Sequence, residues 1–175
     1  MYRKAIIIED EVNIMINKLY LEMIKYDEGD PKRIQHFTKV HSYAKLIGEL
    51  EGFEPDELFI LEAAALTHDI GIHVCEEKYG SCAGNLQEIE GPSIAEEMLN
   101  KLGFEPKVVD RVKYLIGHHH TYTNIDGLDY QILVEADFIV NLFENGIDQK
   151  AIENAYNNIF KTKTGKQIMR DMYGL

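Results

Sequence analysis

Histidine and carboxylate side chains recur in this sequence beside apolar segments. His68 and Asp69 follow the apolar run 58–66, His36 lies in an earlier amphipathic segment, and Asp137 lies within the stretch ILVEADFIVNLF. A buried carboxylate without a partner is costly, so these groups need compensation. A divalent cation would supply it, and imidazole together with carboxylate suits Mn, Fe, Co, Ni or Zn better than Ca. The pattern therefore predicts a transition-metal site.

Three consecutive histidines form a second group of candidate ligands. His118, His119 and His120 end the segment PKVVDRVKYLIGHHH, and the register after the preceding apolar pair favours His119 and His120 over His118. Each of them could act as a ligand, and a solvated helix end is the alternative for each. We expect the two remaining histidines, His41 and His73, to be structural.

The segments that carry these residues have helical periodicity and helical start and stop signals. Prolines open four of the segments, and glycines follow several of them. Helices are predicted over residues 9–26, 31–51, 55–68, 92–102, 106–120, 129–145, 148–160 and 166–173. The helix at 55–68 is apolar on most sides and is predicted to be central and buried. No alternating strand pattern is present, so the predicted fold is all-α. Residues 75–91, with three glycines, are predicted to form an irregular loop.

Length, composition and charge limit the classes of protein to which the chain can belong. Its 175 residues suffice for one domain, taken as 1–175, and 45% of them are hydrophobic. The formal net charge of −12 argues against nonspecific binding to nucleic acid or to anionic membranes. No stretch reads as a signal peptide or a membrane span. Cys75 and Cys82 do not form a CxxC pair, so we expect reduced thiols in a cytoplasmic protein.

The order of the candidate ligands resembles a known family signature. His36, then His68 and Asp69, then Asp137 are similar to the H…HD…D motif of the HD-domain superfamily, whose members are mostly metal-dependent phosphohydrolases. The framing sequences HFTKVHSYA, ALTHDIG and ILVEADFIVN also resemble that motif. The resemblance covers residues 31–146 and implies an all-α, HD-domain-like helical bundle with flanking helices at both ends. It also implies that these four residues coordinate one ion.

A second ion is an alternative that the resemblance leaves open. Some members of this superfamily bind two ions and carry extra histidines at the place of His118, His119 and His120. By this resemblance, His119 or His120 could bind a second ion or a phosphate group. Such members usually have another histidine in the preceding helix, but the segment QEIEGPSIAEEML contains none. Glu88 or Glu90 could supply an oxygen ligand in its place.

By the same resemblance, the expected activity is hydrolysis of a phosphate ester or anhydride of a nucleotide-like small molecule. The metal would bind a phosphoryl oxygen and lower the pKa of a bound water. Asp69 is the candidate to orient that water or accept its proton. Lys78, Arg111 or Lys113 could contact the phosphate, with a solvated surface role as the alternative for each.

Two subfamilies do not fit the sequence, and two other classes stay open. Guanosine-polyphosphate hydrolases carry the pattern HDxxED at the His-Asp pair, whereas this chain has HDIGIHV there. HD-GYP cyclic-di-GMP phosphodiesterases carry a Gly-Tyr-Pro motif, whereas this chain has NIDGLDYQ. A di-iron oxygenase on the same ligand set, or a metal-holding sensor without turnover, remains an alternative to hydrolysis. The motifs predict neither the natural substrate nor the oligomeric state.

Overall fold

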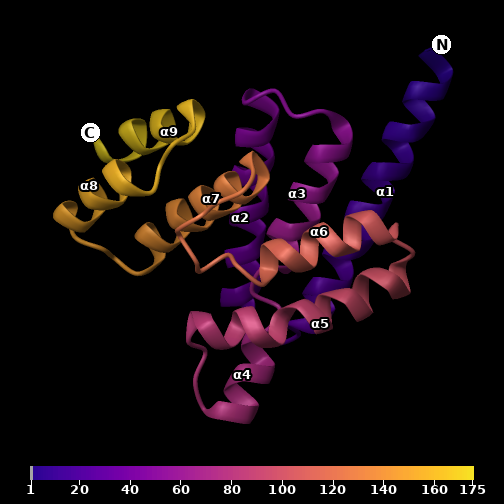
Figure 1. Cartoon of the computed structure of the whole chain (residues 1–175), viewed down its shortest axis with the longest axis horizontal. Helices are drawn as coiled ribbons and strands as arrows, with labels where there is room; N and C mark the ends of the chain where they lie inside the picture. The colour runs from indigo at the N-terminus through magenta and orange to yellow at the C-terminus, as the bar shows by residue number, and fades with distance from the viewer. Residues whose placement is uncertain (1) are drawn as a thin grey trace.

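Helix α3 (Pro55–Thr67) lies at the centre of the structure (Figure 1). The computed structural model describes the backbone of residues 2–175 and the side chains from Val12 onward. In α3 every residue from Leu61 to Thr67 is buried, because α1, α2, α6 and α7 all pack against it. A helix covered on all sides has to be apolar all round. The prediction of a central buried helix is therefore confirmed.

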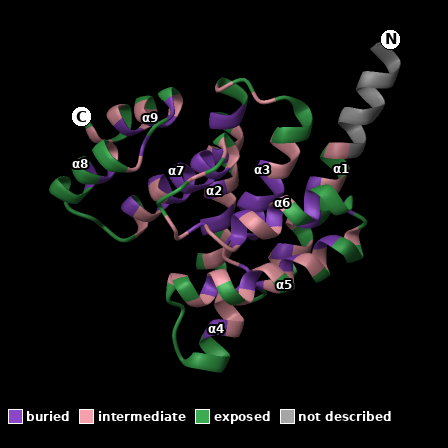
Figure 2. Cartoon of the chain, in the orientation of Figure 1, coloured by how far each residue is buried: buried purple, intermediate pink, exposed green. Residues whose placement is uncertain are grey.

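The other helices surround α3, and buried residues concentrate on their inward faces (Figure 2). In chain order they are α1 (Tyr2–Tyr26), α2 (Pro31–Leu50), α4 (Ile72–Tyr79), α5 (Gly84–Leu102), α6 (Pro106–Ile116), α7 (Leu128–Glu144), α8 (Gln149–Asn158) and α9 (Lys163–Tyr173). α2 packs against α3 and α7, α5 packs against α6, and α8 and α9 lie together beside α7 (Figure 1). Within residues 2–175 the elements are helices and connecting turns, which confirms the all-α prediction.

Most predicted helix boundaries agree with the structure. The side chain of Asp30 accepts a hydrogen bond from the backbone N–H of Arg33, and Pro31 occupies the first helical position of α2. Pro55 and Pro106 open α3 and α6 in the same way. α1 begins earlier than predicted, at Tyr2, although the side chains of residues 1–11 lie outside the described part.

The predicted irregular loop at 75–91 is wrong. Residues 72–79 form α4 and residues 84–102 form α5, so only residues 80–83 connect them. Pro92, read as the start of a helix, lies inside α5. Proline removes one backbone donor there, and tertiary packing outweighs that loss.

The three glycines in this region have different roles: Gly80 ends α4, whereas Gly84 and Gly91 permit close packing. Gly80 has a positive φ of 63° and ends α4, as a glycine at a helix end commonly does. A Cβ on Gly84 would lie 2.6 Å from Cγ of His120, and a Cβ on Gly91 would lie 2.7 Å from Ile116. Gly84 and Gly91 both belong to α5, so the close approach of neighbouring segments explains why these positions are glycine.

One segment, Pro55–Tyr79, is long and apolar enough to cross a membrane by length and composition alone, contrary to the expectation from the sequence. It consists of α3, a turn and α4, and 61% of its apolar 18-residue stretch is buried inside the bundle. This apolar character is accounted for by the position of α3 in the core. Both cysteines, Cys75 and Cys82, are free thiols, with Cys75 buried.

Candidate metal centre

The four residues of the motif come together from three parts of the fold. His36 lies on α2, His68 and Asp69 lie in the turn after α3, and Asp137 lies on α7. Nε2 of His36 lies 3.3 Å from Nε2 of His68 and 3.1 Å from Oδ1 of Asp137. Oδ2 of Asp69 lies 3.4 Å from Nε2 of both histidines. Nε2 of His68 lies 3.5 Å from Oδ1 of Asp137.

These separations match the edges of a metal coordination shell. Zinc and similar ions bind nitrogen and oxygen at roughly 2.0–2.2 Å. Neighbouring ligands at 90° to 109° around such an ion are therefore about 2.8–3.6 Å apart. The five observed separations, from 3.1 to 3.5 Å, all fall in this interval. The arrangement can hold one divalent ion between the four side chains.

Hydrogen bonds orient both imidazoles for this role. Nδ1 of His36 donates to Oε2 of Glu144 at 2.9 Å, because a carboxylate can only accept. Nδ1 of His68 donates to the carbonyl oxygen of Ala65, also at 2.9 Å. In the neutral tautomers each Nε2 therefore carries a lone pair, and the two lone pairs face each other. Metal-binding histidines typically donate their other ring N–H to a carboxylate or a backbone carbonyl in this way.

The electrostatics of this group favour a cation. Burial opposes the charged form of His68, but the carboxylates of Asp69 and Asp137 outweigh burial and raise the pKa of His68 well above its ordinary value. Burial also opposes the charged carboxylates, yet the adjacent imidazoles hold the pKa of Asp69 and Asp137 below the ordinary value. The carboxylates remain ionised, so positive charge is required beside them, from protons or from a metal ion.

A second group of donors lies on the other side of Asp69. Its Oδ1 lies 3.5 Å from Nε2 of His119, whereas its Oδ2 faces His36 and His68. Donor atoms of Asp69, His119 and His120 all lie within 4.8 Å of one another. The two oxygens of one carboxylate therefore face two separate clusters of imidazoles, an arrangement that can bridge two ions.

The other candidates for the second group have different surroundings. His118 stacks on Tyr114 with ring centroids 4.2 Å apart, and its Nδ1 donates to the carbonyl oxygen of the same residue. Glu88 accepts hydrogen bonds at 3.0 Å from the backbone N–H of His120 and from the hydroxyl of Thr121. Glu88 thus supports the turn that carries the histidines, and His118 packs against α6.

The basic residues suggested as phosphate contacts are engaged in ion pairs. The pairs are Lys78–Glu90 at 2.6 Å, Arg111–Asp129 at 2.7 Å and Lys113–Glu96 at 2.6 Å. These three cations do not line the cavities at the metal centre. His41 bonds to buried Glu62 and His73 bonds to Asp27, both at 2.8 Å.

Two cavities meet at the metal centre. The first has a volume of about 350 Å³ and contains His36 and Asp69. Its cationic side chains are Lys32 and Arg33, and four carboxylates beyond the motif also line it, namely Asp27, Asp30, Glu76 and Glu144. An anion would be repelled from such a cavity unless metal ions supplied positive charge.

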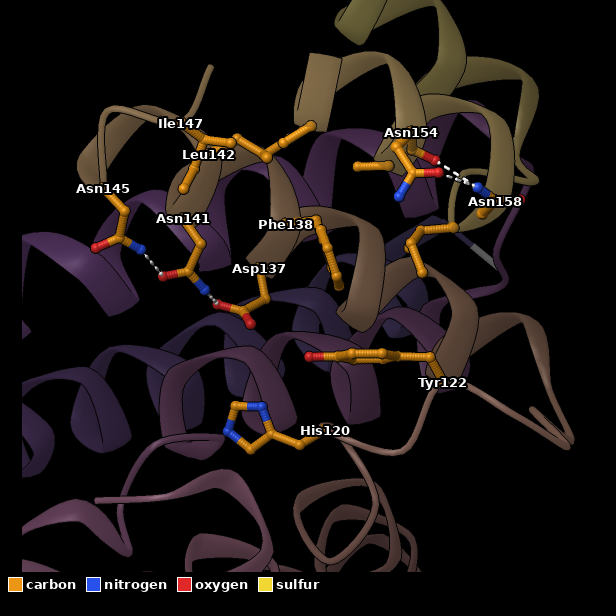
Figure 3. A pocket seen from close by; sticks show the side chains of 13 residues that line it. His120, Tyr122, Asp137, Phe138, Asn141, Leu142, Asn145, Ile147, Asn154 and Asn158 are labelled. Atoms are coloured by element: carbon orange, nitrogen blue, oxygen red, sulfur yellow. Dashed lines mark hydrogen bonds between the residues drawn. The ribbon is translucent and has the colours of Figure 1, made fainter. Parts of the chain in front are cut away.

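The second cavity, of about 410 Å³, lies between α7 and α8 (Figure 3). It shares His120, Asp137, Asn141 and Asn145 with the first cavity. Its remaining lining is uncharged and combines aromatic, aliphatic and amide side chains, namely Tyr122, Phe138, Leu142, Ile147, Ala151, Asn154, Ala155, Asn158 and Ile159. The ring of Tyr122 projects into this cavity in Figure 3, opposite Asn141 and Asp137.

Sequence reasoning missed several residues of the site. Glu144 orients His36, and Asn141 donates to Oδ1 of Asp137 at 2.8 Å. Both follow Asp137 on α7 by one or two helical turns, and Arg33 precedes His36 by one turn on α2. Helical spacing from the motif residues would have identified all three, because residues three, four or seven apart share a helix face.

Comparisons with known proteins agree with this geometry. A family model described as HD domain matches residues 33–153. A crystal structure of a predicted HD superfamily hydrolase from an uncultured Thermotogales bacterium is similar, with a TM-score of 0.62 and 28% sequence identity. The match covers 93% of this chain and 84% of that chain. Among curated proteins, none matches. With its motif residues gathered on an all-α bundle and most of its length matched, this chain belongs to the HD-domain family.

Proposed function

We propose that the protein is a phosphohydrolase dependent on a divalent transition-metal ion held by His36, His68, Asp69 and Asp137. The observation that carries the proposal is the convergence of two imidazole Nε2 atoms and two carboxylate oxygens at 3.1–3.5 Å. Membership of the HD-domain family and the similarity to a predicted HD superfamily hydrolase support hydrolysis.

When bound, a divalent ion supplies Lewis acidity to a phosphoryl oxygen and to a water. Asp69 is partly exposed, at 26% of its side chain, and lines the first cavity, so its carboxylate is the candidate to orient a water there or accept its proton. His120 acts in its neutral form, because burial and the neighbouring His119 lower its pKa to about 4. At neutral pH His120 is therefore a ligand or a hydrogen-bond partner and does not serve as a proton donor.

The cavities suggest how a phosphorylated substrate lies. The phosphoryl group belongs beside the metal centre, where Arg33, itself paired with Glu76 at 2.7 Å, is the one guanidinium among the residues that line the first, acidic cavity. The organic group belongs in the second cavity, since that lining is uncharged beyond His120 and Asp137. Aromatic rings and amides suit a flat, uncharged group with donors and acceptors, such as a nucleobase.

Hydrolysis of a panel of nucleotides and phosphodiesters tests the proposal. The protein is first stripped of metal and then loaded with Mn²⁺, Co²⁺, Ni²⁺, Fe²⁺ or Zn²⁺. We expect phosphate or nucleotide release that requires one of these ions and disappears in the double variant His68→Ala/Asp69→Ala. Metal-loaded protein that hydrolyses nothing in the panel would refute the proposal and favour a sensor that holds metal without turnover.

A pair of variants tests the position of the organic group. Asn158→Asp introduces a negative charge into the second cavity and should raise the KM of a nucleotide substrate by about tenfold through repulsion. Asn157→Asp makes the same change at an exposed neighbour that does not line the cavity. An equal KM in the two variants would contradict the placement.

A di-iron oxygenase is the second candidate, because Asp69 presents one oxygen to each cluster of imidazoles. Oxygen uptake by iron-loaded protein in the presence of reductant, without phosphate release, would favour this class over hydrolysis.

A further inference from the structure

Three buried polar atoms beside the metal centre have no hydrogen-bond partner. They are Oε1 of Gln87, Nε2 of His119 and Nε2 of His120. The separation of 3.5 Å between His119 Nε2 and Asp69 Oδ1 is too long for a good hydrogen bond. Buried polar atoms without partners are rare and costly, so their concentration at one place needs a reason.

The amide of Gln87 is held in a defined orientation. Its Nε2 donates to the carbonyl oxygen of Cys82 at 2.8 Å, so Oε1 must point away from that carbonyl. The residue is only 5% exposed, and it lines the acidic cavity together with Asp69 and His120. Gln87 therefore presents a fixed and unpaired acceptor to the cavity that contains the metal centre.

The packing of α5 explains how Gln87 comes to lie there. Gly84, one turn earlier on α5, lies directly against the ring of His120. Gly71, two residues after Asp69, lies against the backbone of Gln87, and its Cβ would be 3.1 Å from the carbonyl oxygen of that residue. The same part of α5 therefore contacts both the turn after α3 and the turn of residues 117–120, here called the histidine turn.

The acidic neighbours of Gln87 are already engaged. Glu88 accepts from the backbone N–H of His120 and from Thr121. Glu90 is bound by Lys78 and Tyr79, both at 2.6 Å. Neither carboxylate is a free oxygen donor for the second cluster, whereas Oε1 of Gln87 is unpaired.

We propose that Oε1 of Gln87, together with Asp69, His119 and His120, binds a second divalent cation. Gln87 takes the place of the further histidine that the sequence lacks in this helix. The site builds on the proposed metal centre, because Asp69 is shared between the two ions. The second site has a single carboxylate, which it shares with the first ion, and its amide ligand is neutral. We therefore expect the second site to bind a cation more weakly than the first site does. An amide oxygen also suits Mn²⁺ better than softer ions.

Titration of metal-free protein with Mn²⁺ tests this site without substrate. We expect two ions per chain, one tight and one weaker, by calorimetry and by electron paramagnetic resonance of the paired ions. Gln87→Met keeps the size of the side chain and removes the oxygen, and it should weaken the second ion by about 10- to 100-fold. Gln87→Glu keeps an oxygen and adds a negative charge, so it should bind the second ion at least as tightly as wild type.

The two variants separate ligation from a structural role. Both lose the donor to the carbonyl oxygen of Cys82, so a purely structural role would make them equally defective. Gln131→Met is the matched control, because Gln131 is also buried, lines neither cavity, and donates to Glu135 and to the carbonyl oxygen of Ile159. It should leave both ions unchanged.

Several results would overturn the second site. They are a single Mn²⁺ per chain in the wild type, an unchanged second affinity in Gln87→Met, or equal loss in Gln87→Met and Gln87→Glu. If the variants fail to fold, anomalous diffraction from Mn²⁺-soaked wild-type crystals decides, since an ion within about 2.6 Å of Gln87 Oε1 is required. Two bound ions without any hydrolysis would refute the proposed activity and leave this site standing.

Discussion

The contact between Glu144 and His36 offers a sharp test of the metal centre. Oε2 of Glu144 accepts from Nδ1 of His36 at 2.9 Å, and its Oε1 pairs with Nζ of Lys39 at 2.5 Å. The Glu144 side chain is only 13% exposed. It therefore holds the imidazole in the tautomer that leaves Nε2 free for a metal ion. Removing such an orienting partner typically lowers metal affinity by about 10- to 100-fold, which corresponds to roughly 1.4–2.8 kcal/mol.

Two substitutions of Glu144 should lower the metal affinity to different extents. Glu144→Gln retains an amide oxygen that can still accept from His36, so the affinity of the first ion should fall by about tenfold. Glu144→Leu leaves the Nδ1–H group of His36 without an acceptor and should cost about 100-fold. The measurement is competition between metal-free protein and a chromophoric chelator for Co²⁺ or Mn²⁺ at constant pH.

Lys39→Met is the matched control for both variants. It removes the ion pair with Glu144 but leaves the bond to His36, so metal affinity should change by less than about threefold, as is typical when a partly exposed ion pair is lost. Wild-type affinity in Glu144→Leu would refute the role of Glu144. A loss in Lys39→Met as large as that in Glu144→Leu would contradict the assignment of the effect to the bond between Glu144 and His36.

Three further outcomes follow from the structure. Asp137→Asn should lower metal affinity by more than about 100-fold, so its melting temperature should barely differ between metal-loaded and chelated samples, whereas an undiminished difference would remove Asp137 from the ligand set. Gly71→Ala should destabilise the fold by about 1–3 kcal/mol in urea unfolding, because its Cβ would lie 3.0 Å from the backbone nitrogen of Gly91, and unchanged stability would contradict this close approach. Burial raises the pKa of Glu62, but its bonds to His41 and Lys45 outweigh burial and hold that pKa below 4.5. Because the folded-state pKa is depressed, the stabilisation is present above about pH 4.5 and is lost as pH falls through the folded-state value. The stability gap between wild type and Glu62→Gln in chelator should therefore narrow on acidification, and a constant gap would contradict the linkage.

Local sequence patterns were sufficient to predict most helices and the main candidates of the site. Apolar spacing and the prolines at 31, 55 and 106 placed α2, α3 and α6, because these signals act through nearby backbone geometry. The order of His36, His68, Asp69 and Asp137 indicated the family, and the structure brings these residues together. Whether they bind a metal ion remains a prediction for the experiments above.

Other features depended on contacts between distant segments, which local patterns do not encode. Gly84 and Gly91 suggested a loop, yet they lie inside α5 because the histidine turn and Ile116 approach its backbone closely. Glu88 was a candidate ligand, yet it caps the turn at His120, whereas Gln87 beside it has the unpaired oxygen. Neighbouring residues on a helix point about 100° apart, so the packing angle of α5 decided which of the two side chains faces the metal centre.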